Sequence, residues 1–439
     1  MNLKWAEDSS KSGLGMEAVL IKKEGRIFYG WFIVAVSFLC WFAADAFGWY
    51  TFGIFIGPMT SEFGWTTLGM TGAMTFRTVA AGLLGLIIGP LADTRHGARV
   101  IMSIGVVITG AVALTVSRIN NLWQFYLLYG LVGALGTVAI GGLVTNTIIA
   151  KWFVRKRGRA MGISTMGVSA AGLVFVPLVH YLISNYGWRT TLIVLGIVIW
   201  VLTFPVIFII RRRPEDMGLM PDGDDPEAIA IETRGPDSLS VLSSGENIWT
   251  LREALRTRTL WLLLIGFNII GLSLFGAIIH FFPYIEDKGF SSDVATAALT
   301  TFAFCALLVK IPWGLIAEKI HVRKCIISCY IGCAIGLVVL INSDTVFSVF
   351  LYSVMYGIAL GGDMVLQELM WANYYGRTFL GTIRGFVMPF FLISMAGGPL
   401  FAAWLRDITG NYNIAYTLFC LAFIIGSLFI YLAKPPERS

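Results

Sequence analysis

The sequence predicts an all-α membrane protein in which twelve transmembrane helices form two pseudo-symmetric six-helix halves. Hydrophobic residues make up 57% of the 439 residues and charged residues 13%, and the mean hydropathy is +0.77. Soluble domains carry about 25% charged residues, so this chain cannot bury its apolar side chains in one core that faces water. Apolar stretches of about 20 residues recur, each long enough to cross a bilayer as a helix. The second half of the chain also repeats a motif of the first half.

The twelve predicted helices follow one another in chain order. They occupy residues 29–58, 67–91, 98–117, 121–151, 160–184, 188–210, 259–286, 292–317, 324–341, 345–374, 381–405 and 412–433. The residues before the first helix are polar and charged, and the first apolar stretch is too long for the core of a signal peptide. We therefore expect no cleavable signal peptide.

A tight basic turn ends the second predicted helix, and a degraded copy ends the eighth. The two copies are Gly89–Arg99 and Gly314–Lys324, which lie 225 residues apart (from 89 to 314). A repeat at about half the chain length predicts two related halves with a substrate site between them near mid-membrane. The expected organisation is a tail, a six-helix half, a linker, a second six-helix half and a tail, at residues 1–28, 29–210, 211–258, 259–433 and 434–439.

Lys and Arg are distributed asymmetrically along the chain. With the N-terminus inside, 26 of the 32 Lys and Arg lie on the inner side, four lie in outer loops and two lie within helices. Positive residues are enriched on the cytoplasmic side of membrane proteins. The pattern predicts a multi-pass protein of the inner (plasma) membrane with both termini in the cytoplasm. It also accounts for the net charge of +6, so no nucleic-acid partner is expected.

The repeated turn resembles the signature loop of the major facilitator superfamily, whose members are transporters. Gly30–Val34 with Tyr50–Phe55, and then Trp152–Gly162, resemble the two signature stretches of the monocarboxylate transporters and their bacterial relatives, which include oxalate–formate antiporters. The resemblance implies a carrier without a cofactor, and not an enzyme. It also implies a gating role for charged residues of the two turns, namely Asp93, Arg95, Arg99 and Glu318. The alternative is a charged turn that only follows the distribution of positive residues.

Lys310 lies four residues before Gly314 in the eighth predicted helix, at a place that resembles the cationic site of those families. The sequence departs from the family pattern here. The family usually has Arg at this position, and Ala306 stands where many members have an Asp one turn earlier. The resemblance therefore implies an anion site at Lys310 but leaves the proton-coupling residue unassigned.

Charged residues inside the predicted helices are functional by default, because a charge at mid-membrane costs at least about 2.5–3.5 kcal/mol. Those that lie away from the helix ends are Asp45, Arg77, Lys310, Asp363 and Glu368. The two cations are candidates to bind a carboxylate, since Arg presents a planar fork and Lys a point charge. The three carboxylates are proton-coupling candidates. Two structural alternatives stay open: an Asp45–Arg77 ion pair, and Glu368 as a brace for Arg384 or Arg377.

Four further residues could make polar contacts to a bound substrate: Tyr126, Asn268, His280 and Tyr284. For His280, near the outer end of the seventh helix, the alternative is a core histidine whose ring nitrogens are already satisfied. Three cysteines repeat every four residues on one face of the ninth helix: Cys325, Cys329 and Cys333. They have no His or carboxylate company, so we expect packing and no metal site.

The sequence thus predicts a secondary active transporter that moves a small organic anion, a mono- or dicarboxylate, by proton symport or anion exchange with alternating access. The alternative is a major facilitator carrier of a cationic or neutral metabolite that binds through the intramembrane carboxylates. A membrane-embedded sensor or enzyme is the poorest reading, because the sequence has no nucleophile–base or metal-ligand cluster. The expected partners are the substrate, protons and the lipid bilayer, and we expect a monomer.

Overall fold

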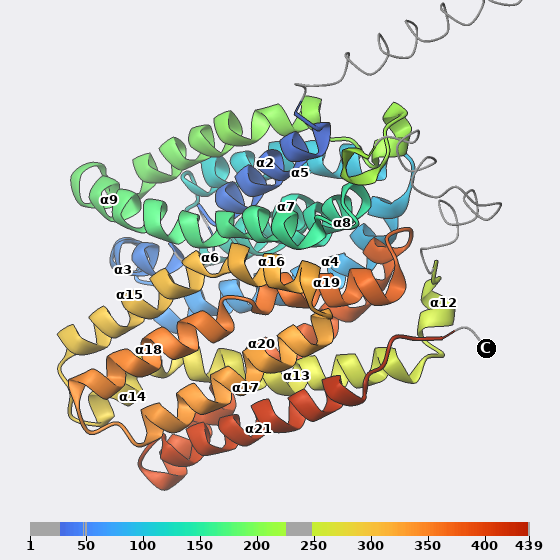
Figure 1. Ribbon diagram of the computed structural model, residues 1–439. Helices are drawn as coiled ribbons and strands as arrows, with labels where there is room; N and C mark the ends of the chain where they lie inside the picture. Colours follow the sequence, from blue (N-terminus) through green and yellow to red (C-terminus); the bar gives the residue numbers. More distant parts are fainter. Residues whose placement is uncertain (1–26, 47, 49–50, 225–247, 438–439) are drawn as a thin grey trace, which may run out of the picture.

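A computed structural model describes residues 27–437 except residues 47, 49–50 and 225–247. Most of the predicted N-terminal tail, part of the predicted linker and the last two residues therefore lie outside the described residues. Figure 1 shows long helices side by side in one bundle, with the first half of the chain (blue to green) on one side and the second half (yellow to red) on the other. Residues 211–224 and the described C-terminus lie at the same end of the bundle, which we call the linker end.

The helices of the first half follow the predicted order. They are α2 (Tyr29–Ala44), α3 (Phe52–Phe63), α4 (Thr67–Asp93), α5 (Gly97–Val116), α6 (Leu122–Phe125), the π-helix η1 (Tyr126–Val132), α7 (Gly133–Ile140), α8 (Gly142–Trp152) and α9 (Arg157–Ile209). The 53-residue α9 holds the fifth and sixth predicted helices. It turns back at Gly187, whose φ of 78° lies in the left-handed region that glycine adopts without a steric penalty.

The second half follows a short folded part of the linker. The linker contributes the 3-10 turns η2 (Pro214–Met217) and η3 (Pro221–Gly223) and the single helical turn α12 (Leu251–Ala254). The half itself comprises α13 (Arg258–Ile279), α14 (Phe281–Asp287), α15 (Ser292–Leu308), α16 (Lys310–Lys319), α17 (Val322–Ile341), α18 (Val346–Leu360), α19 (Asp363–Tyr375), α20 (Leu380–Thr409) and α21 (Asn413–Leu432).

The bundle confirms the predicted twelve transmembrane helices. Among the described residues, ten helices are long and apolar enough to cross a membrane. One of the ten, α9, supplies two crossings, and α2 with α3 forms a further one. The first crossing is not the single helix predicted over 29–58, because α2 ends at Ala44 and α3 begins at Phe52. Asp45 and Gly48 lie in this interruption, and both are weak helix formers.

Two glycine-lined crossings join the halves near the linker end. At the first, α4 meets α20 so closely that a Cβ atom on Gly89 would overlap the backbone of Gly381. At the second, α9 meets α16, and a Cβ atom on Gly158 would overlap the backbone of Gly314. Small residues allow membrane helices to approach to backbone contact. The two halves are therefore closed against each other at the linker end.

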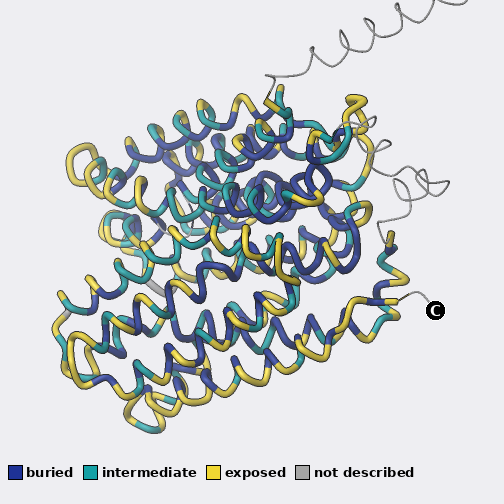
Figure 2. The backbone as a smooth tube through the Cα atoms, viewed as in Figure 1, coloured by how far each residue is buried: buried dark blue, intermediate teal, exposed yellow. Residues whose placement is uncertain are grey.

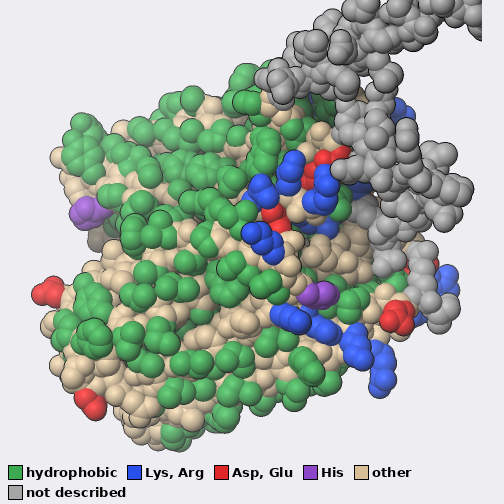
Figure 3. Space-filling model, viewed as in Figure 1, with side chains coloured by type: hydrophobic (Ala, Val, Ile, Leu, Met, Phe, Trp, Pro, Cys, Tyr) green, Lys and Arg blue, Asp and Glu red, His purple; other side chains and the backbone are tan. Residues whose placement is uncertain are grey.

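The outer surface of the bundle is suited to lipid. Buried residues line the inside of each half and the contact between the halves, whereas exposed residues cover the outside (Figure 2). Exposed apolar side chains such as Leu83, Ile87 and Val201 lie on that outside. On the face drawn in Figure 3, apolar side chains dominate away from the linker end, and Lys and Arg gather toward it.

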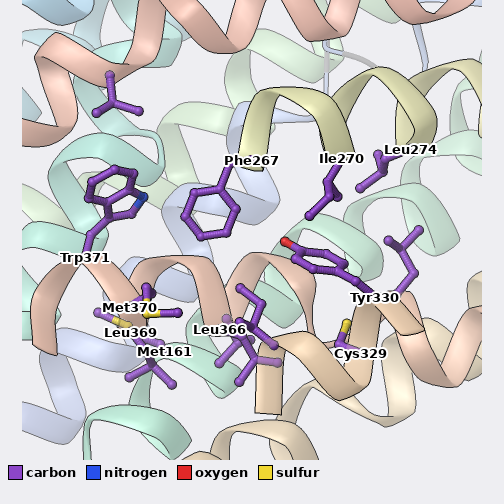
Figure 4. Packing of buried hydrophobic residues seen from close by; sticks show 14 of the residues in the cluster. Met161, Phe267, Ile270, Leu274, Cys329, Tyr330, Leu366, Leu369, Met370 and Trp371 are labelled. Atoms are coloured by element: carbon purple, nitrogen blue, oxygen red, sulfur yellow. The ribbon is translucent and has the colours of Figure 1, made fainter. Parts of the chain in front are cut away.

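Aromatic and aliphatic side chains fill the core of the second half (Figure 4). Phe267 of α13 and Trp371 of α19 have ring centroids 5.8 Å apart, and Leu366 belongs to the same buried cluster. Met161 of α9 also belongs to this cluster. The core of the second half therefore extends across the contact with the first half.

Candidate functional site

Lys310 lies at the contact between the two halves. It is the first residue of α16, directly after the break between α15 and α16, and only 4% of its surface is exposed. Its Nζ donates a hydrogen bond of 2.9 Å to the backbone carbonyl of Thr165 on α9, in the other half. The charges of Asp45 and Asp363 act on its ammonium group. The second half thus presents a buried cation whose hydrogen-bond acceptor is a neutral carbonyl.

Asp363 is held by neutral donors. It begins α19, after the break at Gly361 and Gly362 that separates α18 from α19. Its Oδ1 accepts hydrogen bonds from the hydroxyl of Tyr330 (2.5 Å) and from the side-chain amide of Gln367 (2.8 Å). The first turn of a helix favours a negative charge, because the backbone N–H groups there form the positive end of the helix dipole. The break in the tenth transmembrane helix therefore creates a buried place for a carboxylate.

Arg77 of α4 is the buried cation of the first half. Its Nη2 donates to the hydroxyl of Thr137 at 2.5 Å, and its guanidinium lies 4.5 Å from the ring centroid of Tyr129. Tyr129 is carried by the π-helix η1, and π-helical turns are frequent at functional sites. A cavity of about 10 Å³ lies beside Arg77, which is room for one water molecule.

Asp45 acts electrostatically on groups at both buried cations, Lys310 and Arg77. It directly follows α2 and is half-buried. Its charge acts on Lys310 and also on the hydroxyl of Tyr129, the ring beneath Arg77. Asp45 from the first half therefore lies within electrostatic reach of groups from both halves.

Glu368 forms an ion pair with Arg384 of α20, one of the two brace partners considered from the sequence. Both side chains are largely buried. The pair joins α19 to α20 within the second half. This contact favours the bracing alternative for Glu368, and its role in proton coupling stays a prediction.

The other four candidates are bound within their own halves. Tyr126 donates to the carbonyl of Gly69 at 3.0 Å, and Tyr284 donates to Oδ1 of Asn413 at 2.6 Å. The Asn268 side chain accepts a hydrogen bond from Ser394 at 2.8 Å. Both ring nitrogens of His280 are engaged, Nδ1 with the Tyr412 hydroxyl and Nε2 with the Pro399 carbonyl, each at 3.0 Å. These contacts join helices inside one half and do not bring the four residues to Lys310.

The two carboxylates of the repeated turn make equivalent contacts across the halves. Asp93 and Glu318 occupy the same position of the repeat, and each reaches the first turn of a helix in the other half. Asp93 accepts from the backbone N–H of Thr382 on α20 at 2.7 Å, and Glu318 accepts from the backbone N–H of Arg159 on α9 at 2.8 Å. A carboxylate at a helix N-terminus is stabilised by the unpaired N–H groups and the helix dipole.

Basic side chains complete these contacts. Lys151 of α8 binds Asp93 at 2.7 Å, and both side chains are 6% exposed. The guanidinium of Arg159 donates to Glu318 at 2.8 Å, and Arg377 donates to the carbonyl of Lys151 at 2.6 Å. Arg95 and Arg99 are exposed, and Arg99 donates to the carbonyl of Ile207 within its own half.

The sequence analysis missed several of these partners: Lys151, Thr165, Arg159 and Thr382. It considered Arg377 only as a brace for Glu368. Lys151 and Arg159 flank or belong to the basic stretch around Trp152–Gly162, which is the signal that pointed to this region. No local pattern reveals that their acceptors lie more than 50 residues away. Thr165 contributes a backbone carbonyl, which no side-chain pattern can indicate.

A twelve-helix bundle of two halves, with buried charges at their contact and a charged seal at one end, defines a polytopic membrane transporter. The sequence model of the Major Facilitator Superfamily matches residues 38–299 and 273–439, and the chain belongs to this superfamily. Members are carriers and not enzymes, as the sequence predicts.

Relatives confirm the predicted branch. The chain is similar to monocarboxylate transporter 11 of Mus musculus, with 24% identity over 79% of this chain and 75% of the relative. It is also similar to monocarboxylate transporter 2 of Rattus norvegicus, with 25% identity over 88% of this chain and 79% of the relative. Among solved structures, the fucose:proton symporter of E. coli aligns with a TM-score of 0.67 at 12% identity, over 92% of this chain and 98% of that chain. At this identity, the last likeness concerns the fold alone.

Proposed function

We propose that the protein carries a small organic anion, a mono- or dicarboxylate, across the membrane by proton symport or anion exchange with alternating access. The observation that carries this proposal is the buried ammonium group of Lys310 at the contact between the halves, bound to the neutral carbonyl of Thr165. A substrate carboxylate is a stronger partner for an ammonium group than a neutral carbonyl, because the carboxylate adds the attraction between two opposite full charges, which is strong away from water. The similarity to monocarboxylate transporters supports the same substrate class.

Arg77 is the second proposed contact of the substrate. It lies in the other half, so an anion bound between Arg77 and Lys310 would draw contacts from both halves. Asp363 is the first candidate for the proton carrier, because its charge acts on Lys310, and Asp45 and Glu368 are the other candidates. Binding the anion and a proton together would keep the net charge of the site unchanged, which limits the cost of a charge in the membrane.

The linker end is proposed to face the cytoplasm, and the protein to lie in the plasma membrane as a monomer. The orientation rests on the distribution of Lys and Arg, which is far richer in the segments at the linker end. Thiol-specific labelling of single cysteines in intact cells would test it. A membrane-impermeant reagent that labels Lys324→Cys from outside would contradict it.

A thermal-shift screen of the purified protein in detergent tests the substrate class. A panel of mono- and dicarboxylates is compared with a panel of amines and neutral metabolites of similar size. We expect carboxylates alone to raise the melting temperature, and we expect Lys310→Ala to remove the shift. The matched control is Lys319→Ala, on the same helix but exposed, which should retain it. Stabilisation by amines or neutral metabolites instead would favour the alternative substrate class.

The best stabilising compound is then tested for transport. Proteoliposomes loaded with that compound should take up the labelled compound by counterflow, at a rate that empty liposomes do not show. Stabilisation without counterflow would contradict the proposed function, because a bound ligand that is never moved is not a substrate.

A further inference from the structure

Residues 214–224, which we call the strap, fold back onto the linker end directly after the sixth transmembrane helix (Figure 1). Gly218 has φ of 68°, and the backbone N–H of Leu219 returns to the carbonyl of Pro214 at 3.0 Å. Gly223 packs against the ring of Phe28, which itself contacts Trp152 of α8 with centroids 5.7 Å apart. The strap is therefore a compact, packed segment rather than an extended connection.

Asp222 attaches the strap to the first half. It is 3% exposed, and among the described residues it is the one non-glycine with positive φ, at 61°. Its Oδ2 accepts from the backbone N–H groups of Val154 (3.0 Å) and Arg155 (2.8 Å), and its Oδ1 accepts from that of Lys156 (3.0 Å). Convergent backbone N–H groups form a nest for an anion. Asp adopts this left-handed backbone more readily than most residues, and the three N–H groups hold its carboxylate in place.

The loop that Asp222 fixes leads directly into contacts with the second half. Arg157, the first residue of α9, donates to Oδ1 of Asn373 at 3.0 Å. Arg159, two residues further, binds Glu318 through its backbone N–H and its guanidinium. The start of α9 therefore lies between two carboxylates, Asp222 from the strap and Glu318 from the other half. Asp222 positions the residues that close the linker end.

Glu215 attaches the strap to the second half. Its Oε1 accepts from Nη2 of Arg377 at 2.6 Å, in the connection between α19 and α20. The other terminal nitrogen of Arg377 donates to the carbonyl of Lys151, whose side chain binds Asp93. The side chains of Glu215 and Arg377 are 33% and 19% exposed, so water can replace this contact.

We propose that the strap is a releasable latch of the transport cycle. Asp222 anchors it to the first half throughout the cycle, because all of its contacts lie within that half. Glu215 ties the strap to the second half only while the linker end is closed, because Arg377 must move away when the halves separate there. Asp222 and Glu215 are thus positioning residues. The proposal requires that the halves separate at the linker end, and it does not depend on the identity of the substrate.

Distances between two spin labels across the linker end test the latch. The labels are placed at His96→Cys and Lys324→Cys, exposed positions at the starts of α5 and α17 in opposite halves. The background is Cys305→Ser, because the other five native cysteines are buried. Glu215→Gln should raise the fraction of long distances about 2- to 5-fold, the effect of losing a partly exposed ion pair. Asp222→Asn should raise it as well, and Asn tolerates the left-handed backbone.

The matched control is Asp224→Asn. Asp224 is a strap carboxylate that pairs at 2.5 Å with Arg155 of the first half. Because this pair does not reach the second half, its removal should leave the distances between the spin labels unchanged. Arg377→Gln should open the linker end at least as far as Glu215→Gln. The double variant should open it no further than Arg377→Gln alone, since both substitutions remove the same contact between Glu215 and Arg377. The proposal is overturned if Glu215→Gln matches Asp224→Asn, or if the effects of Glu215→Gln and Arg377→Gln add. These variants decide the matter even if Asp222→Asn does not fold.

Discussion

Asp93 and Thr382 are joined across the two halves by two hydrogen bonds, because the backbone N–H (2.7 Å) and the hydroxyl (2.8 Å) of Thr382 both donate to Oδ2 of Asp93. The other oxygen of the same carboxylate accepts from Lys151 at 2.7 Å. The charge of Asp93 is thus balanced by Lys151 within its own half, while its second oxygen accepts hydrogen bonds from Thr382 in the other half. One side chain therefore links the charge balance of the first half to the closure of the linker end.

We predict that Asp93→Asn slows transport and leaves substrate affinity nearly unchanged. Asparagine keeps one acceptor but loses the charge that balances buried Lys151, so the closed linker end is destabilised. A loss of about 1.5 kcal/mol, the lower end of the range for a hydrogen bond to a charged group, lowers the ratio of closed to open protein roughly tenfold. Counterflow rates and thermal-shift titrations measure the two effects separately.

Thr382→Val is the companion variant for this prediction. Valine removes the hydroxyl donor but keeps the backbone N–H, so we expect a smaller loss of rate in the same direction. Wild-type counterflow by Asp93→Asn would refute a role of this contact in transport.

We predict that Lys310→Ala weakens substrate binding by roughly 30-fold or more, since truncating one partner of a buried charge pair costs about 2–5 kcal/mol. Lys310→Arg should retain part of the affinity, because the charge is kept but the guanidinium does not fit the carbonyl of Thr165 in the same way. Titration of the stabilising compound by thermal shift measures both. Equal affinity of wild type and the alanine variant would exclude Lys310 as the anion site.

We predict that Gly158→Val holds the linker end open. The backbones of Gly158 and Gly314 are in contact, so a side chain at either position must push α9 and α16 apart. The spin-label pair across the linker end should then report mainly long distances. The control is Gly53→Ala, because a side chain added at Gly53 of α3 meets open space and should leave the distances unchanged. Gly289 is also surrounded by open space but has a positive φ, so a substitution there would strain the backbone. A closed distance distribution in Gly158→Val would contradict the crossing.

The fold was predictable because the membrane imposes a simple rule on the sequence. Each crossing needs about 20 apolar residues, so the ninth predicted helix (324–341) differs from α17 by two residues at one end. The rule fails where a helix is interrupted inside the membrane. The breaks after Ala44 and Leu360 and the π-helix η1 leave the apolar pattern intact, and hydropathy does not detect them. The residue boundaries of the two predicted halves stay predictions.

The contacts of the repeated turn between the halves were predictable in part, and the buried site was less so. The repeat identified Asp93 and Glu318, and the structure places both at the contact between the halves. Their partners could not be derived, because a contact over hundreds of residues depends on how the halves dock. Charge inside an apolar helix correctly selected buried groups such as Asp363 and Lys310. It could not distinguish a residue that faces the other half from one, such as His280, that is satisfied within its own half.

The final prediction concerns proton coupling. Asp363 is bound by the neutral groups of Tyr330 and Gln367, and its charge acts on Lys310. Asn at this position resembles the protonated side chain and cannot change its charge. We therefore expect Asp363→Asn to abolish uptake driven by an inward pH gradient but to spare counterflow, which needs no net proton movement. Asp45→Asn should instead lower expression or folding if Asp45 balances Arg77, because a buried charge without its partner is costly.

Uptake into proteoliposomes, with and without a pH gradient, measures this difference in both variants. Asp344→Asn, at an exposed carboxylate between α17 and α18, is the control and should behave as wild type. Accumulation of substrate against its gradient by Asp363→Asn would show that the proton is carried elsewhere. Uptake by the wild-type protein that does not depend on the pH gradient would indicate anion exchange. In that case Asp363→Asn should change the affinity of the Lys310 site for the anion and not the driving force, because the substitution removes the negative charge that acts on the ammonium group.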